Sequence, residues 1–106
     1  MAKLLITGKY TAEGAKGLIK EGGSKRKAAV EKAIKGLGGK LESFYYAYGE
    51  ADVYVVVDMP DTTSALALSL VVNASGAAHI QTIPLMTVED VDAACKKSVD
   101  YRAAGA

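Results

Sequence analysis

The sequence lacks a second cysteine, a dominant sign of charge and any long apolar run. Because Cys95 has no cysteine to pair with, no disulfide can form within the chain, which favours a reducing compartment. The 13 basic and 12 acidic residues leave a net charge of +1, so charge gives no reason to expect nucleic acid or a membrane as partner. The longest apolar-rich stretch, residues 65–72, is far shorter than the ~20 residues of a membrane-spanning helix. The first residues show no signal peptide, and we therefore expect a cytoplasmic protein.

Motifs typical of metal sites, nucleophilic catalysis and nucleotide binding are also missing. The sequence has no CxxC or HxxxH pair, no acidic cluster at metal-ligand spacing, no GxSxG turn and no Walker-type loop. We therefore expect neither a metal ion nor another cofactor; a metal bound by a single histidine across a dimer or trimer axis is the alternative.

The sequence does contain alternating strand and helix patterns. Apolar and polar residues alternate in a way that predicts strands at residues 3–10, 40–48, 52–59 and 77–86. Helical periodicity predicts helices at residues 11–21, 24–37, 61–75 and 87–97. This order predicts an α+β fold of the ferredoxin-like type, with a four-stranded antiparallel sheet, helices on one face and an extra C-terminal helix. The length fits a single domain, 1–106, of which residues 98–106 are expected to be a flexible tail.

Polar residues mark the expected starts of the helices. The expected N-caps are Thr11, Ser24, Asp61 or Thr62, and Thr87, which lies at capping-box spacing from Asp90. The helix at residues 61–75 is apolar most of the way round, so we expect it to be deeply buried. We expect Cys95, on the apolar stripe of the last helix, to be buried and unreactive.

The hairpin at residues 40–59 carries large side chains on both faces. In its first strand we expect Leu41, Ser43 and Tyr45 on one face, and Phe44, Tyr46 and Tyr48 on the other. Because helices cover only one face of such a sheet, either choice leaves an apolar and aromatic patch bare. Burial of each ring is worth roughly 1.5–3 kcal/mol, so we expect a second copy to cover that face in a homodimer or higher homo-oligomer.

Three stretches resemble the GYD domain family: LLITGKYTAEGAKGL at residues 4–18, KAIKGLGGKLESFYYAYGEADVYVVVDMPD at residues 32–61, and MTVEDVDA at residues 86–93. The family is named for a glycine, a tyrosine and an aspartate. This chain has Gly49 and Asp52 at the outer two positions, whereas Ala51 replaces the tyrosine. The resemblance implies a ferredoxin-like fold of the dimeric α/β-barrel type. It implies no activity, because the function of the family is unknown.

Several residues are candidates for a functional site. His79, the only histidine, can act as a general base near neutral pH, and a surface or structural role is the alternative. Tyrosines both pack and hydrogen-bond, so the candidates for ligand binding are Tyr10, Tyr46 and Tyr48 together with Asp58. A core or interface role is the alternative for these tyrosines. We expect Gly49 and Asp52 to shape the hairpin turn.

The basic run SKRK, residues 24–27, opposes the dipole of the helix that it starts. An anionic ligand would relieve that cost, and a solvated helix face is the alternative.

Two functions remain open. The first is a homo-oligomeric protein that binds a small ligand or has a structural, accessory role. The alternative is a cofactor-free enzyme of the dimeric α/β-barrel class, acting on a small aromatic or oxidised substrate with His79 as base. A pocket that joins His79 to Tyr10 or Tyr46 would favour the enzyme.

Overall fold

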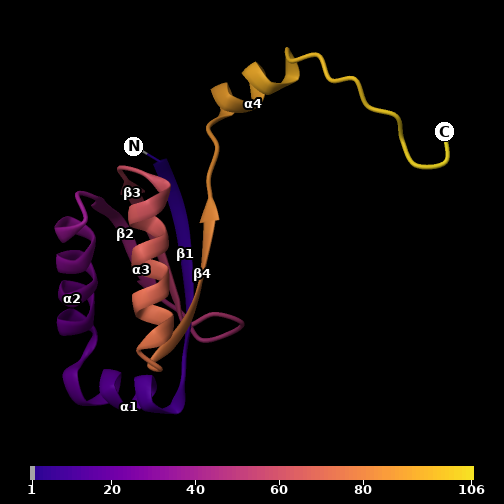
Figure 1. Ribbon diagram of the computed structural model, residues 1–106. Helices are drawn as coiled ribbons and strands as arrows, with labels where there is room; N and C mark the ends of the chain where they lie inside the picture. The colour runs from indigo at the N-terminus through magenta and orange to yellow at the C-terminus, as the bar shows by residue number, and fades with distance from the viewer. Residues whose placement is uncertain (1) are drawn as a thin grey trace.

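The computed structural model describes residues 2–106, whose strands form one antiparallel sheet (Figure 1). The strands are β1 (Ala2–Tyr10), β2 (Lys40–Tyr46), β3 (Val53–Met59) and β4 (Ala78–Pro84), in the order β2-β3-β1-β4. This arrangement confirms the predicted four-stranded, ferredoxin-like layout. The sheet stays open, with β2 and β4 as its edges, so the barrel that the resemblance implied is not supported.

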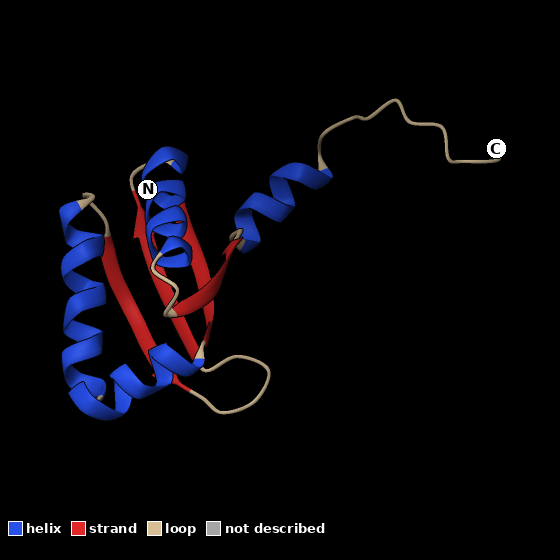
Figure 2. Cartoon of the chain, turned by 60° about the horizontal axis from the view of Figure 1, so that its bottom comes forward, coloured by secondary structure: helices blue, strands red, loops and turns tan. Residues whose placement is uncertain are grey.

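The helices before β4 lie on one side of this sheet. They are α1 (Ala12–Glu21), α2 (Gly23–Gly36) and α3 (Thr62–Ala74). α2 packs on β2 and α3 packs mainly on β4, while α1 crosses one end of the sheet (Figures 1 and 2). Gly22 separates α1 from α2 with a φ of 86°, a conformation that glycine adopts without strain. Gly22 is also the N-cap of α2, so the expected start at Ser24 is wrong by two residues.

Side-chain caps fix the other helix starts as predicted. The Thr11 hydroxyl accepts a hydrogen bond from the Gly14 amide, and an Asp61 carboxylate oxygen accepts one from the Ser64 amide at 2.7 Å. Thr87 and Asp90 form the predicted capping box at the start of α4 (Val88–Cys95). Each such cap is worth about 0.5–2 kcal/mol, and those of Thr11 and Asp61 fix the points where the chain turns from a strand into a helix.

The core lies between the sheet and the helices. Its members are side chains from both central strands and from α2 and α3: Leu4, Ile6, Ile34, Val53, Val55, Val57, Met59 and Leu68. The expectation that residues 61–75 form a deeply buried helix is wrong, because only Leu68 of α3 is buried. Leu66, Leu70 and Val71 are more than half exposed, since α3 lies on the surface of a two-layer structure and has an outward side.

A β-bulge changes which side chains of β2 share a face. The pairing of β2 with β3 shifts between Leu41 and Ser43, so one extra residue of β2 lies opposite β3. Leu41 therefore packs against the core together with Phe44, whereas Ser43 and Tyr45 lie on the opposite face. The expectation that Leu41 shares a face with Tyr45 is wrong, because it assumed unbroken alternation along the strand.

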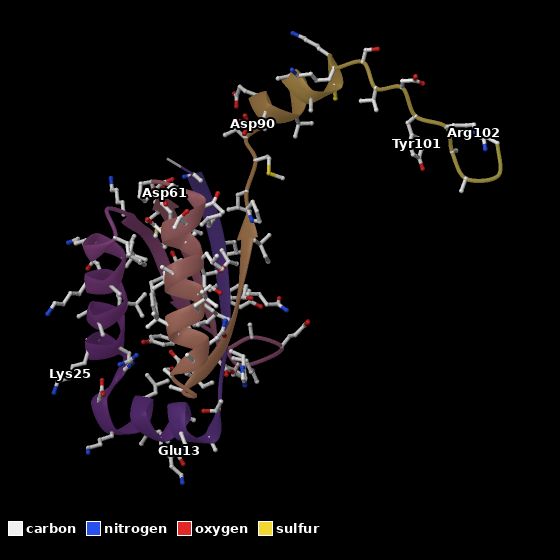
Figure 3. All side chains as sticks on the ribbon, viewed as in Figure 1. Glu13, Lys25, Asp61, Asp90, Tyr101 and Arg102 are labelled. Atoms are coloured by element: carbon white, nitrogen blue, oxygen red, sulfur yellow. The ribbon has the colours of Figure 1, made fainter. Side chains whose placement is uncertain are left out.

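α4 and the chain beyond it stand away from the body (Figure 3). Every residue from Leu85 to Ala106 is exposed, and the last backbone link to the sheet is the Leu85 amide, which donates to the Lys3 carbonyl at 2.9 Å. The radius of gyration is 17.0 Å, against about 13 Å for a compact domain of this length. Cys95 is exposed on this arm, so the expectation of a buried thiol is wrong.

Candidate functional site

Two hollows lie on opposite faces of the sheet. The first, called here the inner cavity, has a volume of about 250 Å³ and lies between α2, α3 and the sheet. The second, called the outer hollow, has a volume of about 640 Å³ and lies mostly on the face without helices, but it reaches round β4 to Asn73 of α3. The enzyme hypothesis required one pocket that joins His79 to Tyr10 or Tyr46, whereas His79 lines the outer hollow and Tyr10 lines the inner cavity.

The walls of the inner cavity are almost entirely apolar. The strands contribute side chains such as Ile6 and Phe44, and the helices contribute Val30, Leu68 and Val72. The cavity exists because α2 packs over β2 while α3 packs over β4, which leaves the middle of the sheet between them. Apolar walls of this kind favour a ligand with an apolar body.

Three residues bring polar groups to the inner cavity: Tyr10, Arg26 and Ser75. The Ser75 hydroxyl is already paired, because it donates to the Val72 carbonyl and accepts from the Ala77 amide. Burial raises the pKa of Tyr10, and the positive charge of Arg26 acts on it in the opposite direction. The polar groups left for a ligand are therefore the phenol of Tyr10 and the guanidinium of Arg26.

Tyr46 lies beside this site without lining the cavity. Its hydroxyl donates a hydrogen bond of 2.8 Å to the Gly23 carbonyl at the start of α2. Its ring packs edge-on against Phe44, with the ring centroids 5.0 Å apart. Burial raises the pKa of Tyr46 as well, and Arg26 again opposes that shift. Tyr46 thus ties β2 to the start of α2, next to the two polar groups of the cavity.

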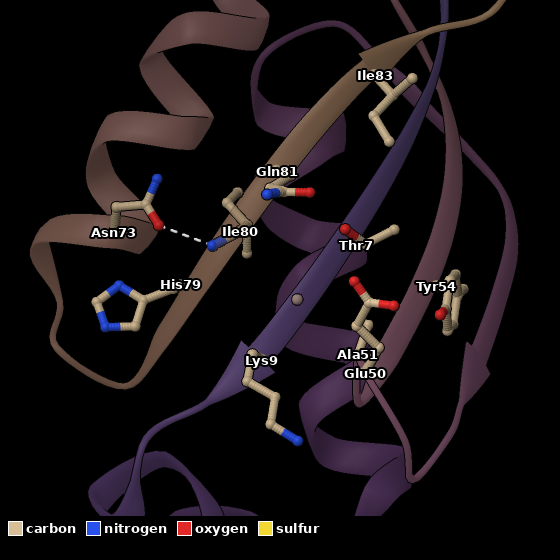
Figure 4. Close-up of a pocket in the computed structure, with 11 residues that line it drawn as sticks. Thr7, Lys9, Glu50, Ala51, Tyr54, Asn73, His79, Ile80, Gln81 and Ile83 are labelled. Atoms are coloured by element: carbon tan, nitrogen blue, oxygen red, sulfur yellow. Dashed lines mark hydrogen bonds between the residues drawn. The ribbon is translucent and has the colours of Figure 1, made fainter.

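The outer hollow contains the predicted base, His79 (Figure 4). His79 pairs with Lys9 across the β1–β4 ladder, and Gln81 lies two residues further on the same face. Tyr54 of β3, Glu50 of the hairpin loop and Asn73 of α3 also line the hollow. Neither Tyr10 nor Tyr46 lines this hollow, so the structure does not assemble the combination of histidine and tyrosine that the enzyme hypothesis required. That hypothesis stays a prediction.

Asp52 joins the hairpin loop to the end of β1. One of its carboxylate oxygens accepts from the Tyr10 amide at 2.9 Å, and the other accepts from the Lys9 ammonium at 3.2 Å. The hydrogen bond from the Tyr10 backbone is the largest cause that lowers the pKa of Asp52. The Lys9 ammonium also donates to the Gly49 carbonyl, whereas the Tyr48 side chain is fully exposed on the loop. Asp52 thus fixes the backbone at Tyr10, one of the two polar residues of the inner cavity.

Asp58 lies in neither hollow. Its pKa is raised, chiefly by a hydrogen bond with Glu42, whose own pKa is lowered mainly by Lys3. Lys3 and Glu42 form an ion pair with a nitrogen–oxygen distance of 2.6 Å. The predicted ligand residue is therefore part of a charged cluster at the far end of the outer face.

Sequence reasoning treated Arg26 only as part of a basic run. A stronger signal was its spacing: Arg26, Val30 and Ala33 follow one another at four and three residues, so they share one face of α2. All three line the inner cavity. Because Arg26 continues the apolar stripe of α2, its position in the sequence indicates a charged group at the edge of an apolar site.

Within residues 2–106, no helix has the length and apolar character to cross a membrane, and no three potential metal ligands gather together. Comparison with curated proteins and with solved structures finds no significant match. The GYD domain family matches residues 4–95, which include all of the sheet except the first two residues of β1, both hollows and α4. The chain therefore belongs to the GYD domain family.

Proposed function

We propose that the protein binds a small, largely apolar molecule in the inner cavity. The observation that supports this proposal is a cavity of about 250 Å³ with apolar walls from the sheet and from two helices. Cavities for drug-sized ligands measure about 300–1,000 Å³, so the ligand is smaller than a typical drug. Most of its binding free energy comes from removing apolar surface from water.

Thermal unfolding of the full chain with small aromatic and aliphatic probes tests this proposal. A ligand that binds only the folded state stabilises it by about 2.7 kcal/mol at 100 times its Kd. We expect indole, phenylacetamide and hexanamide to raise the midpoint of unfolding. The probes are used one at a time and in excess.

Two alanines of α2 provide a matched pair of variants. Ala33→Phe places a ring in the inner cavity and should remove the ligand-induced rise, whereas Ala28→Phe, outside the cavity, should preserve it. If no probe raises the midpoint, or if both variants respond like the parent chain, the inner cavity is not the binding site.

A second observation favours a homo-oligomer. Tyr45 of the edge strand β2 is 71% exposed on the outer sheet face, and Tyr54 of β3 and Ile83 of β4 are also exposed there. The charges at the two ends of this face are already paired, through Lys3 with Glu42 and Lys9 with Asp52. A sheet face with exposed aromatic and apolar side chains, whose charges at both ends are paired, suits association with a second copy, because like charges would not be forced together.

Light scattering coupled to size exclusion, over a range of concentrations, tests this association. We expect the parent chain to be a dimer or larger, and Tyr45→Glu to shift it towards the monomer. Tyr48→Glu is the control, because Tyr48 is fully exposed on the hairpin loop, outside the strands. A parent chain that is monomeric at every concentration would refute the proposed association.

A further inference from the structure

We infer that the ligand of the inner cavity is a small apolar carboxylic acid, whose carboxylate binds the Arg26 guanidinium and the Tyr10 hydroxyl. This inference rests on the proposed function and names the chemical class of the ligand. It depends on what the two polar groups of the cavity can donate, and on the absence of an acidic partner inside the cavity.

Arg26 differs from the other cations of the basic run. Arg26 lines the inner cavity, whereas Lys25 and Lys27 are exposed, and Figure 3 shows Lys25 on the outside of α2. Arg26 and Tyr10 line the same cavity, and the positive charge of Arg26 opposes the rise in the pKa of Tyr10 and of Tyr46. A cation beside an apolar cavity favours an anionic group on the ligand.

The guanidinium of Arg26 has N–H donors that make no hydrogen bond to a side chain of the described residues. Among residues 2–106 its one side-chain partner is Glu21, at 3.6 Å, which is longer than a hydrogen bond. The arginine side chain is 37% exposed, so the charge lies at the mouth of the cavity rather than in its depth. Its five N–H donors form a planar fork that matches the two oxygens of a carboxylate.

Tyr10 supplies the second donor. Its hydroxyl has no hydrogen-bond partner among the described residues, although its backbone amide is held by Asp52. Because burial raises the pKa of Tyr10, the phenol keeps its proton at neutral pH and can donate it. The Tyr46 hydroxyl already donates to Gly23, which leaves Tyr10 as the phenol that is free to bind a ligand.

The start of α2 adds to the positive potential at this end of the cavity. No acidic residue lies in its first turn, and its N-cap, Gly22, has no side chain to accept from the exposed amides. The positive end of the helix dipole and three neighbouring cations therefore lie together. A carboxylate offsets this charge, whereas a ligand ammonium group would be repelled.

Titration calorimetry with matched acid and amide pairs tests the inference. The probes are phenylacetate with phenylacetamide, and hexanoate with hexanamide, which share an apolar body and differ in charge. A hydrogen bond to a charged group contributes enough to make each acid bind on the order of 10- to 100-fold more tightly than its amide. We also expect the acids, but not the amides, to bind more weakly as salt is added.

Variants separate the two donors. Arg26→Gln should remove the preference for acids while the amides still bind, and Arg26→Lys should restore part of it. Lys25→Gln, which removes a neighbouring cation outside the cavity, should keep the preference. Tyr10→Phe should weaken acid binding several-fold. Arg26→Gln removes a cation from a helix start, so the fold is not expected to suffer.

The outcomes distinguish the inference from the proposed function. If acids and amides bind equally well, or if the preference for acids survives Arg26→Gln, the inference of a carboxylate ligand is refuted. The apolar cavity would still be a binding site. If no compound of either series binds, the proposed function is refuted, and so is the inference that the ligand is a carboxylic acid.

Discussion

Replacing Gly14 by alanine would place a methyl group against the backbone that closes the inner cavity. A Cβ atom at Gly14 lies 1.8 Å from the Ala77 carbonyl oxygen, so the two segments would have to separate by about 1.5 Å to reach ordinary contact. That movement breaks two hydrogen bonds, from the Thr11 amide to Ala77 and from the Thr11 hydroxyl to Gly76. Each contributes about 0.5–1.5 kcal/mol.

The helix itself gains from the same substitution. Alanine stabilises a helix interior by up to about 1 kcal/mol relative to glycine, which offsets part of the loss. We therefore expect Gly14→Ala to lower the free energy of unfolding by about 1–2 kcal/mol, with a fall of ~4–8 °C in Tm for each kcal/mol. Ligand binding should weaken as well, because Ala77 lines the inner cavity.

Gly17 is the matched control, since it lies one turn later in α1 and a methyl group added there would have no atom within 4 Å. Gly17→Ala should raise the free energy of unfolding by about 0.5–1 kcal/mol. Urea unfolding followed by circular dichroism measures both variants. If Gly14→Ala is as stable as Gly17→Ala, the close approach of α1 to Ala77 is not what holds these segments together.

Three further changes have definite expected outcomes. Ile34 is fully buried and Ile19 is 85% exposed, so Ile34→Ala should cost about 2–5 kcal/mol in urea unfolding and Ile19→Ala less than about 0.5. Asp61→Ala removes the N-cap of α3 and should cost about 1 kcal/mol, which Asp61→Ser should largely restore. Because the folded pKa of Asp52 is lowered, its contribution is present above the unfolded pKa and is lost as the pH falls through the folded value. Asp52→Asn should therefore lose less stability on acidification than the parent chain, and an equal loss would contradict the role of its carboxylate.

The order of strands and helices could be predicted because it depends on local patterns. Thr11, Asp61 and Thr87 each precede an apolar-periodic segment, and each caps a helix in the structure. In β3, residues of one parity, from Val53 to Met59, are buried and the residues between them are not, as the strand pattern requires. Helix caps and strand alternation can be predicted because they are determined by residues close together in the sequence.

Features that depend on contacts between distant segments could not be predicted in this way. The bulge after Leu41 arises from pairing with β3, and it reverses the faces of part of β2. The inner cavity depends on the separation of α2 from α3, so the sequence showed Arg26 only as part of the basic run and not as a lining residue of a cavity. The exposure of Cys95 follows from the direction in which the chain leaves Pro84, which no periodicity encodes.

That direction has a practical consequence. Because residues 85–106 bury nothing against the body, a protease that cuts just after Leu85 should leave a fragment ending at that residue that still unfolds cooperatively. The same geometry makes the C-terminal end the better place for a label or a surface tether, since it lies far from the inner cavity (Figure 1). A fluorophore attached through the exposed thiol of Cys95 would report on encounters between molecules and leave the cavity unobstructed.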